Sequence, residues 1–179
     1  VDDPERDVFK PPAFMVAMVE QGILGNKTRG GFYKKTKEGL MTFDTVKLEY
    51  RPKAGNDDIK KFCKGLKGSP ADRVKALVEN DGPAGQFAWN ILSRTLAYSA
   101  AKIPEITDRV EDVDNGMKWG YNWDLGPFET WDAIGFKAAY DRMKADGIEL
   151  PASIDKMAES GAESFYTDDG RVYDLVNGG

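Results

Sequence analysis

The stretch of sequence that decides the fold lies between residues 117 and 135. It reads Met117-Lys118-Trp119-Gly120-Tyr121-Asn122-Trp123-Asp124-Leu125-Gly126-Pro127-Phe128-Glu129-Thr130-Trp131-Asp132-Ala133-Ile134-Gly135. Its large rings stand close to glycines, which indicates backbone packed tightly against bulky, buried side chains. Gly126 suits the N-cap of a helix, Pro127 its first position, and Glu129 its first turn, where negative charge favours the helix dipole. We therefore expect a helix to about Trp119, an ordered turn, and a second short helix ending near Gly135.

The composition is that of an ordinary globular protein, and it restricts the possible chemistry. Hydrophobic residues make up 41% and charged residues 31% of the 179 residues, enough for one or two small domains. The net charge of −5 argues against nucleic acid as a partner, and the apolar runs are too short to span a membrane. Cys63 is the only cysteine, which excludes an internal disulfide and a cysteine-based metal site, so the cytoplasm is the expected compartment. The absence of histidine removes the commonest general base and the commonest transition-metal ligand.

The first part of the chain predicts one helix and one β-hairpin. In order, we expect the end of a linker (1–10), a helix that begins at Pro11 and Pro12 and stops at Gly22, a basic loop (25–31), two hairpin strands (32–35 and 40–44), and an extended segment that becomes a linker (45–58). The second part predicts helices that begin at Ser69-Pro70, Pro83, Thr107, Gly135 and Pro151, besides the short one at Gly126. The longest, from Pro83 to about Lys102, is expected to bury Phe87, Ile91, Leu92, Thr95 and Tyr98.

The end of the chain repeats the plan of its first part. Met157-Ala158-Glu159-Ser160-Gly161 followed by Phe165-Tyr166 matches Met18-Val19-Glu20-Gln21-Gly22 followed by Phe32-Tyr33. In each copy a helix ends at glycine and a Phe-Tyr pair opens a hairpin, the second with an Asp169-Gly170 turn. We predict the tail of one repeat with a hairpin and linker in residues 1–56, and one complete repeat in 57–179. Coincidence is the alternative explanation of two matching tails.

Two motifs resemble the C-terminal domain of 3-hydroxyacyl-CoA dehydrogenases. The first is Met18-Val19-Glu20-Gln21-Gly22-Ile23-Leu24-Gly25-Asn26-Lys27-Thr28-Arg29-Gly30-Gly31-Phe32-Tyr33, and the second is Asp114-Asn115-Gly116-Met117-Lys118-Trp119-Gly120-Tyr121-Asn122-Trp123-Asp124-Leu125-Gly126-Pro127-Phe128-Glu129. The tryptophan-rich form is most similar to the second repeat of bifunctional chains in which a dehydrogenase precedes an enoyl-CoA hydratase. The sequence departs from the family at Arg29 and Asn122, where glycine is frequent, and these departures put the detailed loop shape in doubt.

The resemblance implies a mainly α fold of the hydroxyacyl-CoA / 6-phosphogluconate dehydrogenase type, with two small β-hairpins. It implies a parent protein that oxidises 3-hydroxyacyl-CoA with NAD in fatty-acid β-oxidation. The family's Gly-rich dinucleotide fingerprint and its catalytic histidine have no counterpart in this sequence. We expect no NAD on this segment and no catalytic residue, since Asn90, the pseudo-equivalent of the family's catalytic Asn, lacks the neighbours that a reaction needs.

Three groups of residues are candidates for a functional role. Lys27, Thr28 and Arg29 form a glycine-flanked basic loop that suits a CoA phosphate, the alternative being a solvated loop. The rings of Trp119, Trp123, Phe128 and Trp131 suit an acyl pocket, but we expect them to form the core of the repeat or its interface with a neighbour. Glu129 and Asp132 have the spacing of an acid/base pair, and we favour the interpretation in which they bind backbone N–H groups. Cys63, among lysines, is regarded as incidental.

We therefore expect a helical domain that encloses substrate and pairs with a repeat or a subunit, and that is inactive by itself. Its expected partners are the upstream NAD-binding domain and first helical repeat, acyl-CoA, an enoyl-CoA hydratase domain downstream where one is present, and a second copy of the chain. The alternatives are a stand-alone protein-interaction module without dehydrogenase activity and a self-contained carboxylate enzyme.

Overall fold

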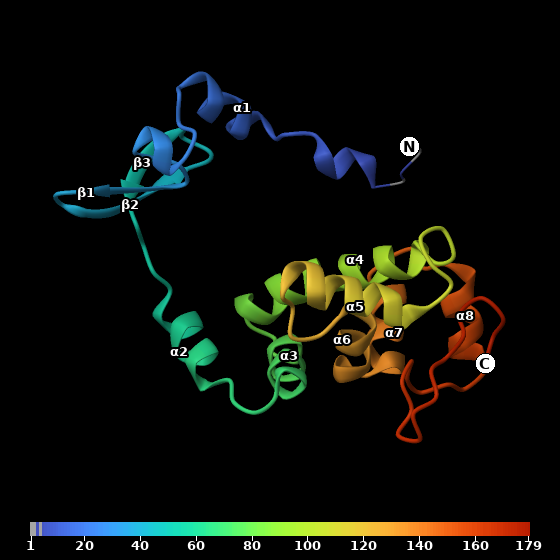
Figure 1. Cartoon of the computed structure of the whole chain (residues 1–179). Coiled ribbons are helices and arrows are strands. Elements are labelled where there is room, and N and C mark those ends of the chain that lie inside the picture. The colour runs from blue at the N-terminus through green and yellow to red at the C-terminus, as the bar shows by residue number, and fades with distance from the viewer. Residues whose placement is uncertain (1–2, 4) are drawn as a thin grey trace. The chain divides into compact units, whose positions relative to one another are not determined.

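The computed structural model describes Asp3 and residues 5–179, and in it the chain forms two compact units (Figure 1). Unit 1 comprises residues 1–56 and unit 2 residues 57–179. The predicted linker end at residues 1–10 includes Val1, Asp2 and Pro4, which lie outside the described residues, and Arg6–Phe9 forms the short 3-10 helix η1. The interpretation of the two units as parts of two repeats stays a prediction.

Unit 1 combines a short helix with a small antiparallel sheet. Its further elements are α1 (Ala13–Glu20), the 3-10 helix η2 (Asn26–Thr28), β1 (Tyr33–Thr36), β2 (Gly39–Asp44) and β3 (Glu49–Pro52), with the strands in the order β1-β2-β3. Helix α1 starts after Pro12, which supplies extended backbone, and stops before Gly22, whose φ of 70° is left-handed. The helix and the first hairpin therefore stand where the sequence predicts them.

The third strand differs from the sequence prediction, in which residues 45–58 become a linker. Asp44 makes the return possible, since its side-chain oxygen accepts hydrogen bonds from the backbone N–H groups of Val46 and Lys47. Strand β3 then pairs with β2, with Phe43 opposite Tyr50. The Tyr50 hydroxyl donates to the carbonyl of Gly31 at 2.7 Å and ties the strand to the basic loop. This last contact joins residues distant in sequence, which a local pattern does not reveal.

Unit 2 is helical. Its helices are α2 (Asp57–Gly65), α3 (Pro70–Val78), α4 (Pro83–Ala101), α5 (Val110–Tyr121), α6 (Pro127–Ile134), α7 (Phe136–Ala145) and α8 (Ala152–Glu159). Helix α3 begins with a capping box in which the Ser69 hydroxyl and the Asp72 carboxylate satisfy each other's backbone N–H groups. Helix α2 is absent from the sequence prediction, and α5 begins at Val110 rather than directly after Thr107. A mainly α fold is thus confirmed for this chain.

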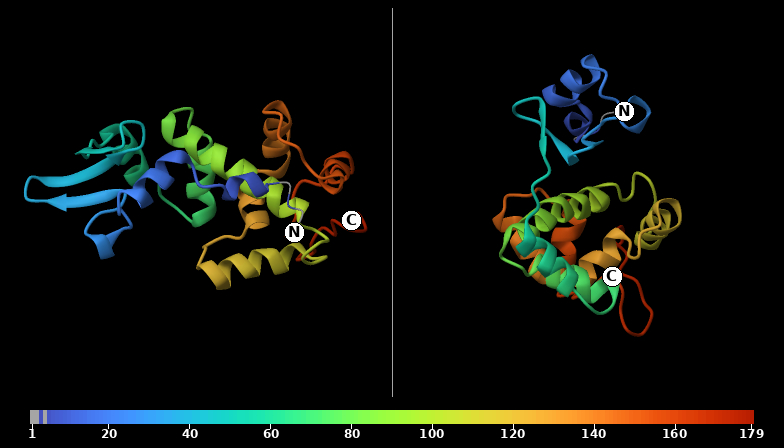
Figure 2. Two further views of the ribbon diagram at one scale, coloured as in Figure 1. Left: turned by 90° about the horizontal axis from the view of Figure 1, so that it is seen from above. Right: turned by 90° about the vertical axis from the view of Figure 1, so that its left-hand side faces the viewer.

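The core of unit 2 is organised around α6. This helix packs against α3, α4, α5 and α7, as the views of Figures 1 and 2 show. Phe128 and Trp131 on α6 are fully buried, together with Phe136 and with Phe165 from the C-terminal segment. The ring of Phe165 lies 4.9 Å from that of Phe128 and 5.4 Å from that of Trp131, in tilted or edge-on contact. The stretch that holds Gly126 and Pro127 therefore supplies the centre of the core.

The predicted buried face of α4 is wrong in part. Phe87 and Ile91 are exposed, whereas the buried residues of α4 are Gly85, Trp89, Ser93, Leu96, Ala97 and Ala100. Trp89 is held against α7, because its indole N–H donates to the carboxylate of Asp146 at 2.6 Å and the guanidinium of Arg142 lies 4.2 Å from its ring. Helix α4 carries two apolar stripes, and the stripe that the other helices cover is the buried one.

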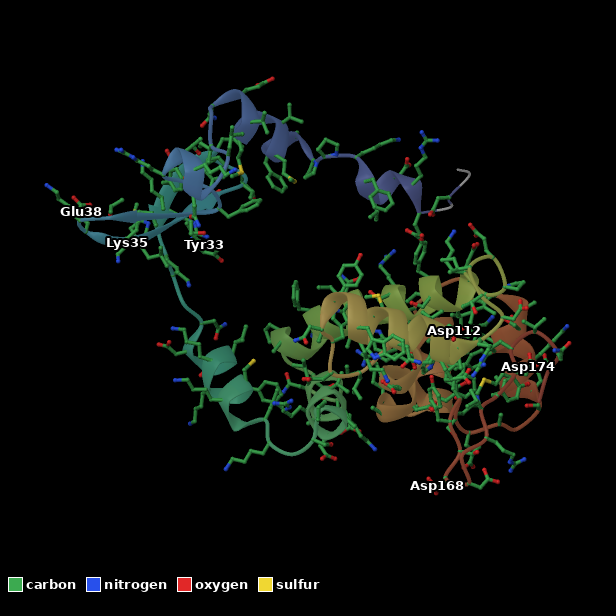
Figure 3. All side chains as sticks on the ribbon, viewed as in Figure 1. Tyr33, Lys35, Glu38, Asp112, Asp168 and Asp174 are labelled. Atoms are coloured by element: carbon green, nitrogen blue, oxygen red, sulfur yellow. The ribbon has the colours of Figure 1, made fainter. Side chains whose placement is uncertain are left out.

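The second predicted hairpin is present as a turn with short, irregular arms. Asp169-Gly170 turns the chain as expected, with φ of 81° at Gly170, and the Thr167 N–H donates to the carbonyl of Arg171 at 3.0 Å. Beyond it a bridge joins Tyr166 and Val172, and the Tyr173 N–H donates to the carbonyl of Phe165 at 2.8 Å, but no strand forms in this described segment. The side chain of Asp168, next to this turn, points away from the helices of unit 2 (Figure 3).

Candidate functional site

The acidic side chains around α6 form a cluster that joins three segments of unit 2. We call it the aspartate clamp and define it as Asp114 on α5, Asp132 on α6 and Tyr166 in the C-terminal segment. The carboxylate of Asp114 accepts hydrogen bonds from the backbone N–H groups of Phe128 (2.8 Å) and Glu129 (3.0 Å) and from the Tyr166 hydroxyl (2.7 Å). Asp114 thus caps the N-terminus of α6 from a neighbouring helix, a function that Gly126 at the N-cap position lacks the side chain to provide.

Gly126 is required by this close approach of backbone to carboxylate. A Cβ atom added at Gly126 would lie 2.3 Å from the Cα atom of Asp114 and 2.3 Å from its Oδ1. The φ of Gly126 is −75°, which any residue adopts, so the requirement is for space and not for backbone conformation. The glycine before Pro127 therefore lets α5 and α6 meet.

Asp132 extends the clamp to the end of the chain. Its two carboxylate oxygens accept from the backbone N–H groups of Phe165 (2.8 Å) and Tyr166 (2.9 Å), more than thirty residues further along. Burial raises the pKa of Asp132 to about 6, and the nearby charge of Asp114 adds to this effect against the two hydrogen bonds that lower it. Burial likewise raises the pKa of Asp114 above its ordinary value, against its three hydrogen bonds. The pKa of Tyr166 is also raised, by burial and by its bond to Asp114.

Glu129 has separate partners, so it shares no proton with Asp132. One of its oxygens accepts from the backbone N–H of Gly126 at 2.8 Å, and the other pairs with the ammonium of Lys118 on α5. Both acids of the candidate acid/base pair are therefore engaged in holding backbone and helices together. Across the described residues, every buried side-chain nitrogen and oxygen has a hydrogen-bond partner. This arrangement can hold the fold, because both carboxylates bind backbone N–H groups.

The four predicted aromatic residues divide into two pairs. Phe128 and Trp131 are fully buried in the core, and the indole N–H of Trp131 donates to the carbonyl of Phe136 at 3.3 Å. Trp119 is 81% exposed and Trp123 is also exposed, so neither belongs to the core of this chain. Phe87 on α4 shares this exposure. An interface role for the exposed rings stays a prediction.

The basic loop of unit 1 combines a structural residue with two exposed cations. The Thr28 hydroxyl accepts from the N–H of Leu24 at 2.9 Å and lies 3.1 Å from the carbonyl of Gly25, so this residue closes the loop. Lys27 and Arg29 are exposed, and Arg29 has a left-handed φ of 62°. A role of Lys27, Thr28 and Arg29 in binding CoA stays a prediction.

Both departures from the family pattern occupy left-handed backbone. Asn122 has a φ of 57°, close to the 62° of Arg29. Glycine adopts this conformation without a steric penalty, asparagine at a small one and arginine at a larger one. Glycine would therefore adopt the backbone conformation of both places with the least strain.

The pairing of Asp114 with Tyr166 does not follow from the sequence. The sequence does carry one signal, because Asp114 is the first residue of the second motif, but nothing local connects it with a tyrosine 52 residues away. In the described part of the chain, no three His, Cys, Asp or Glu side chains are grouped so that they could hold a metal ion. Within the same residues, no helix is long and apolar enough to cross a membrane. Cys63 is exposed on α2.

Comparison with known proteins finds similarity to single segments of larger enzymes. The chain is 42% identical over 167 residues to a probable 3-hydroxyacyl-CoA dehydrogenase of Bacillus subtilis, a match that covers 92% of this chain and 21% of that protein. It is 27% identical over 135 residues to a putative fatty acid oxidation complex trifunctional enzyme of Rickettsia felis, covering 72% of this chain and 17% of that protein. The corresponding protein of Rickettsia prowazekii is 29% identical over 119 residues, or 63% of this chain and 15% of that protein.

The chain thus spans about a fifth or less of the length of these curated relatives. No family model and no solved structure matches it. These likenesses support a relationship to the C-terminal domain of 3-hydroxyacyl-CoA dehydrogenases.

Proposed function

We propose that this chain is a helical C-terminal segment of an NAD-dependent 3-hydroxyacyl-CoA dehydrogenase of fatty-acid β-oxidation, and that it is inactive alone. The observation that carries the proposal is the 42% identity to the Bacillus subtilis relative over 92% of this chain. The aspartate clamp supports it, because both Asp114 and the Gly126-Pro127 helix start belong to the motif that carries the resemblance. In this proposal the segment encloses substrate and pairs with other parts of a longer cytoplasmic protein, which include an enoyl-CoA hydratase where one is attached.

The described residues do not fit NAD. A dinucleotide is held by a glycine-rich turn between a parallel strand and a helix, whose N-terminus faces the pyrophosphate. The one sheet found in the described residues is antiparallel throughout, and the sequence contains neither the G-x-G-x-x-G pattern nor a histidine. In our proposal NAD and the catalytic histidine therefore belong to other parts of the longer protein, and no step of the reaction is assigned to this segment.

The acids near α6 support the assignment of a structural role. A general acid or base needs a proton path to a reacting atom. Asp114 and Asp132 instead direct their oxygens at backbone N–H groups and at the Tyr166 hydroxyl. In the proposed parent protein the clamp keeps α6 and the C-terminal segment together, so that the helical surface presented to the substrate-binding domains is rigid.

The proposal is tested by NADH formation from a 3-hydroxyacyl-CoA. The isolated chain is expected to give no turnover, whereas the full-length parent protein is expected to be active. Deletion of this segment from the parent is expected to abolish activity, while the NAD-binding part still binds NADH. Turnover by the isolated chain would favour a self-contained enzyme. A parent protein that lacks dehydrogenase activity and a nucleotide-binding domain would favour a stand-alone protein-interaction module.

A further inference from the structure

Unit 1 contains an apolar groove between α1 and the start of the hairpin. It has a volume of about 290 Å³ and is lined by Met15, Met18, Val19, Ile23, Leu24, Gly25, Gly31 and Phe32. The side chains that line it remain open to solvent to an unusual degree for such residues, since Met15 is 41% and Phe32 47% exposed. An apolar groove of this kind is suited to bind an apolar partner.

Unit 2 contains a structural counterpart of this groove. Helix α8, the glycine that stops it and the Phe-Tyr pair after it correspond to α1, Gly22 and Phe32-Tyr33. Both glycines are left-handed, with φ of 70° at Gly22 and 79° at Gly161. In both copies the phenylalanine carbonyl accepts a 2.8 Å hydrogen bond from an aromatic residue further along, Phe43 in unit 1 and Tyr173 in unit 2. The two segments therefore share backbone geometry as well as sequence.

The two copies differ in what covers them. Ile154, Met157 and Phe165 correspond to Met15, Met18 and Phe32, and all three are 0% exposed. In unit 1 Met18 is buried as well, at 5%, whereas Met15 and Phe32 are exposed. The cover in unit 2 is α6, whose rings at 128 and 131 contact Phe165. No described residue of unit 1 supplies a helix in this place, because α1 is its only α-helix in the part of the chain that the structure describes.

The polar contacts point to the same missing helix. In unit 2, Asp132 of α6 accepts the N–H groups of Phe165 and Tyr166. In unit 1 the N–H of Phe43 donates to the carbonyl of Phe32, and the next residue, Tyr33, stands opposite Thr42. By the alternation of an antiparallel ladder, the N–H of Tyr33 therefore points away from β2. Among the described residues, none accepts a hydrogen bond from the N–H of Phe32. The N–H groups of Phe32 and Tyr33 therefore suit an aspartate carboxylate on a helix whose aromatic side chains fill the groove, as Asp132 of α6 does in unit 2.

We propose that the groove of unit 1 binds a short helix with the chemistry of α6. This helix carries aromatic side chains at the positions of Phe128 and Trp131 and an aspartate next to the second ring, whose carboxylate accepts the N–H groups of Phe32 and Tyr33. The occupant is a segment of the longer protein outside this chain, so the inference rests on the proposed function. A second copy of the chain is not suited to supply it, because α6 is the centre of the core of unit 2 and would have to leave that core.

A peptide with the sequence of residues 124–136 serves as the probe, because it contains the capping residues and both rings of α6. The full chain, labelled with ¹⁵N, is titrated with the peptide and followed by amide NMR. The amide protons of Phe32 and Tyr33 are expected to shift downfield as they bind a carboxylate, while the resonances of unit 2 stay in place. A peptide with Asp132→Asn is expected to bind about tenfold more weakly, the loss of one charge-assisted hydrogen bond.

Two matched variants of the chain test the location. Met15→Glu places a charge in the groove and is expected to weaken binding at least tenfold, whereas Val16→Glu places the same charge on the neighbouring residue of α1, which does not line the groove, and is expected to leave binding unchanged. Both residues are exposed, so the folds of the variants are expected to stay intact, and their NMR spectra verify this.

Several results would overturn the inference. The first is that the peptide does not bind. The second is that the Asp132→Asn peptide binds as tightly as the unchanged peptide, or that the Met15→Glu chain binds as tightly as the native chain. The third is that only resonances of unit 2 shift, which would mean that the peptide replaces α6 in unit 2. Shifts of Phe32 and Tyr33 that grow with chain concentration without peptide would identify a second copy as the occupant. If the parent protein has dehydrogenase activity and any of these results is obtained, only this inference is refuted, since the proposed function does not depend on the groove.

Discussion

The substitution Asp114→Asn tests whether the aspartate clamp holds unit 2 together. The asparagine side chain has the same shape, so it leaves no cavity and changes only charge and hydrogen bonding. One of the two side-chain oxygens becomes an NH₂ group. That group would face either the N–H of Phe128, or the N–H of Glu129 and the Tyr166 hydroxyl. At least one buried donor at the N-terminus of α6 therefore loses its acceptor.

The magnitude follows from these contacts. A hydrogen bond to a charged group contributes about 1.5–3 kcal/mol, and a buried donor without an acceptor costs about 1–3 kcal/mol. The neutral side chain gains back part of this loss, because burial disfavours the carboxylate of Asp114, as its raised pKa indicates. We therefore expect the free energy of unfolding of unit 2 to fall by about 2–3 kcal/mol.

The assay is urea denaturation followed by tryptophan fluorescence. All four tryptophans lie in residues 57–179, so the signal reports unit 2 alone. The matched control is Asp112→Asn on the same helix, an exposed residue whose carboxylate accepts a hydrogen bond from the Thr107 hydroxyl (Figure 3). The control is expected to change the free energy by less than about 0.5 kcal/mol. An Asp114→Asn variant as stable as the control would refute the clamp as the element that holds α6.

Substitutions at Asp132, Gly126 and Arg29 give three further predictions. The pKa of Asp132 is about 6 in the folded state and 3.8 ordinarily, so its contribution to stability is fully present below pH 3.8 and is lost as pH rises through 6. The measurement is urea denaturation of the native chain and of Asp132→Asn at a series of pH values. The difference between their unfolding free energies is expected to change between pH 3.8 and 6 and to be flat above this window. Gly126→Ala is expected to destabilise unit 2 by about 3 kcal/mol or more in the same assay, because its Cβ atom overlaps the backbone of Asp114; a change below about 1 kcal/mol would contradict the close approach of α5 to α6. Arg29→Gly is expected to stabilise unit 1 by about 0.5–1 kcal/mol, since φ at this position is 62°. The measurement is the protection of the β1–β2 amides from hydrogen exchange, and unchanged protection would contradict the prediction.

Helix ends are predictable because their signals are local. Ser69 and Pro70 begin α3, and Gly126 and Pro127 begin α6, as their capping chemistry indicates. Gly22 stops α1 because it adopts the left-handed conformation that a helix end requires. Each of these depends on atoms within a few residues, so the sequence pattern contains the information.

The candidate site is predictable only in outline. The stretch around α6 is the packing centre that the sequence indicates, but its rings separate into buried Phe128 and Trp131 and exposed Trp119. An apolar pattern along a helix does not indicate which side a neighbour covers, and the same reason explains the exposed Phe87 on α4.

By itself, the sequence determined the mainly helical class, the starts of α3 and α6 and the Asp169-Gly170 turn. Only the tertiary structure decided that Asp114, Asp132 and Tyr166 form one clamp, that β3 completes a sheet, and that the groove of unit 1 stays open while its counterpart in unit 2 is covered. The physical reason is the range of the forces involved. Backbone conformation and capping act within a turn of chain, whereas burial and buried hydrogen bonds depend on groups more than 50 residues apart that meet only in the fold.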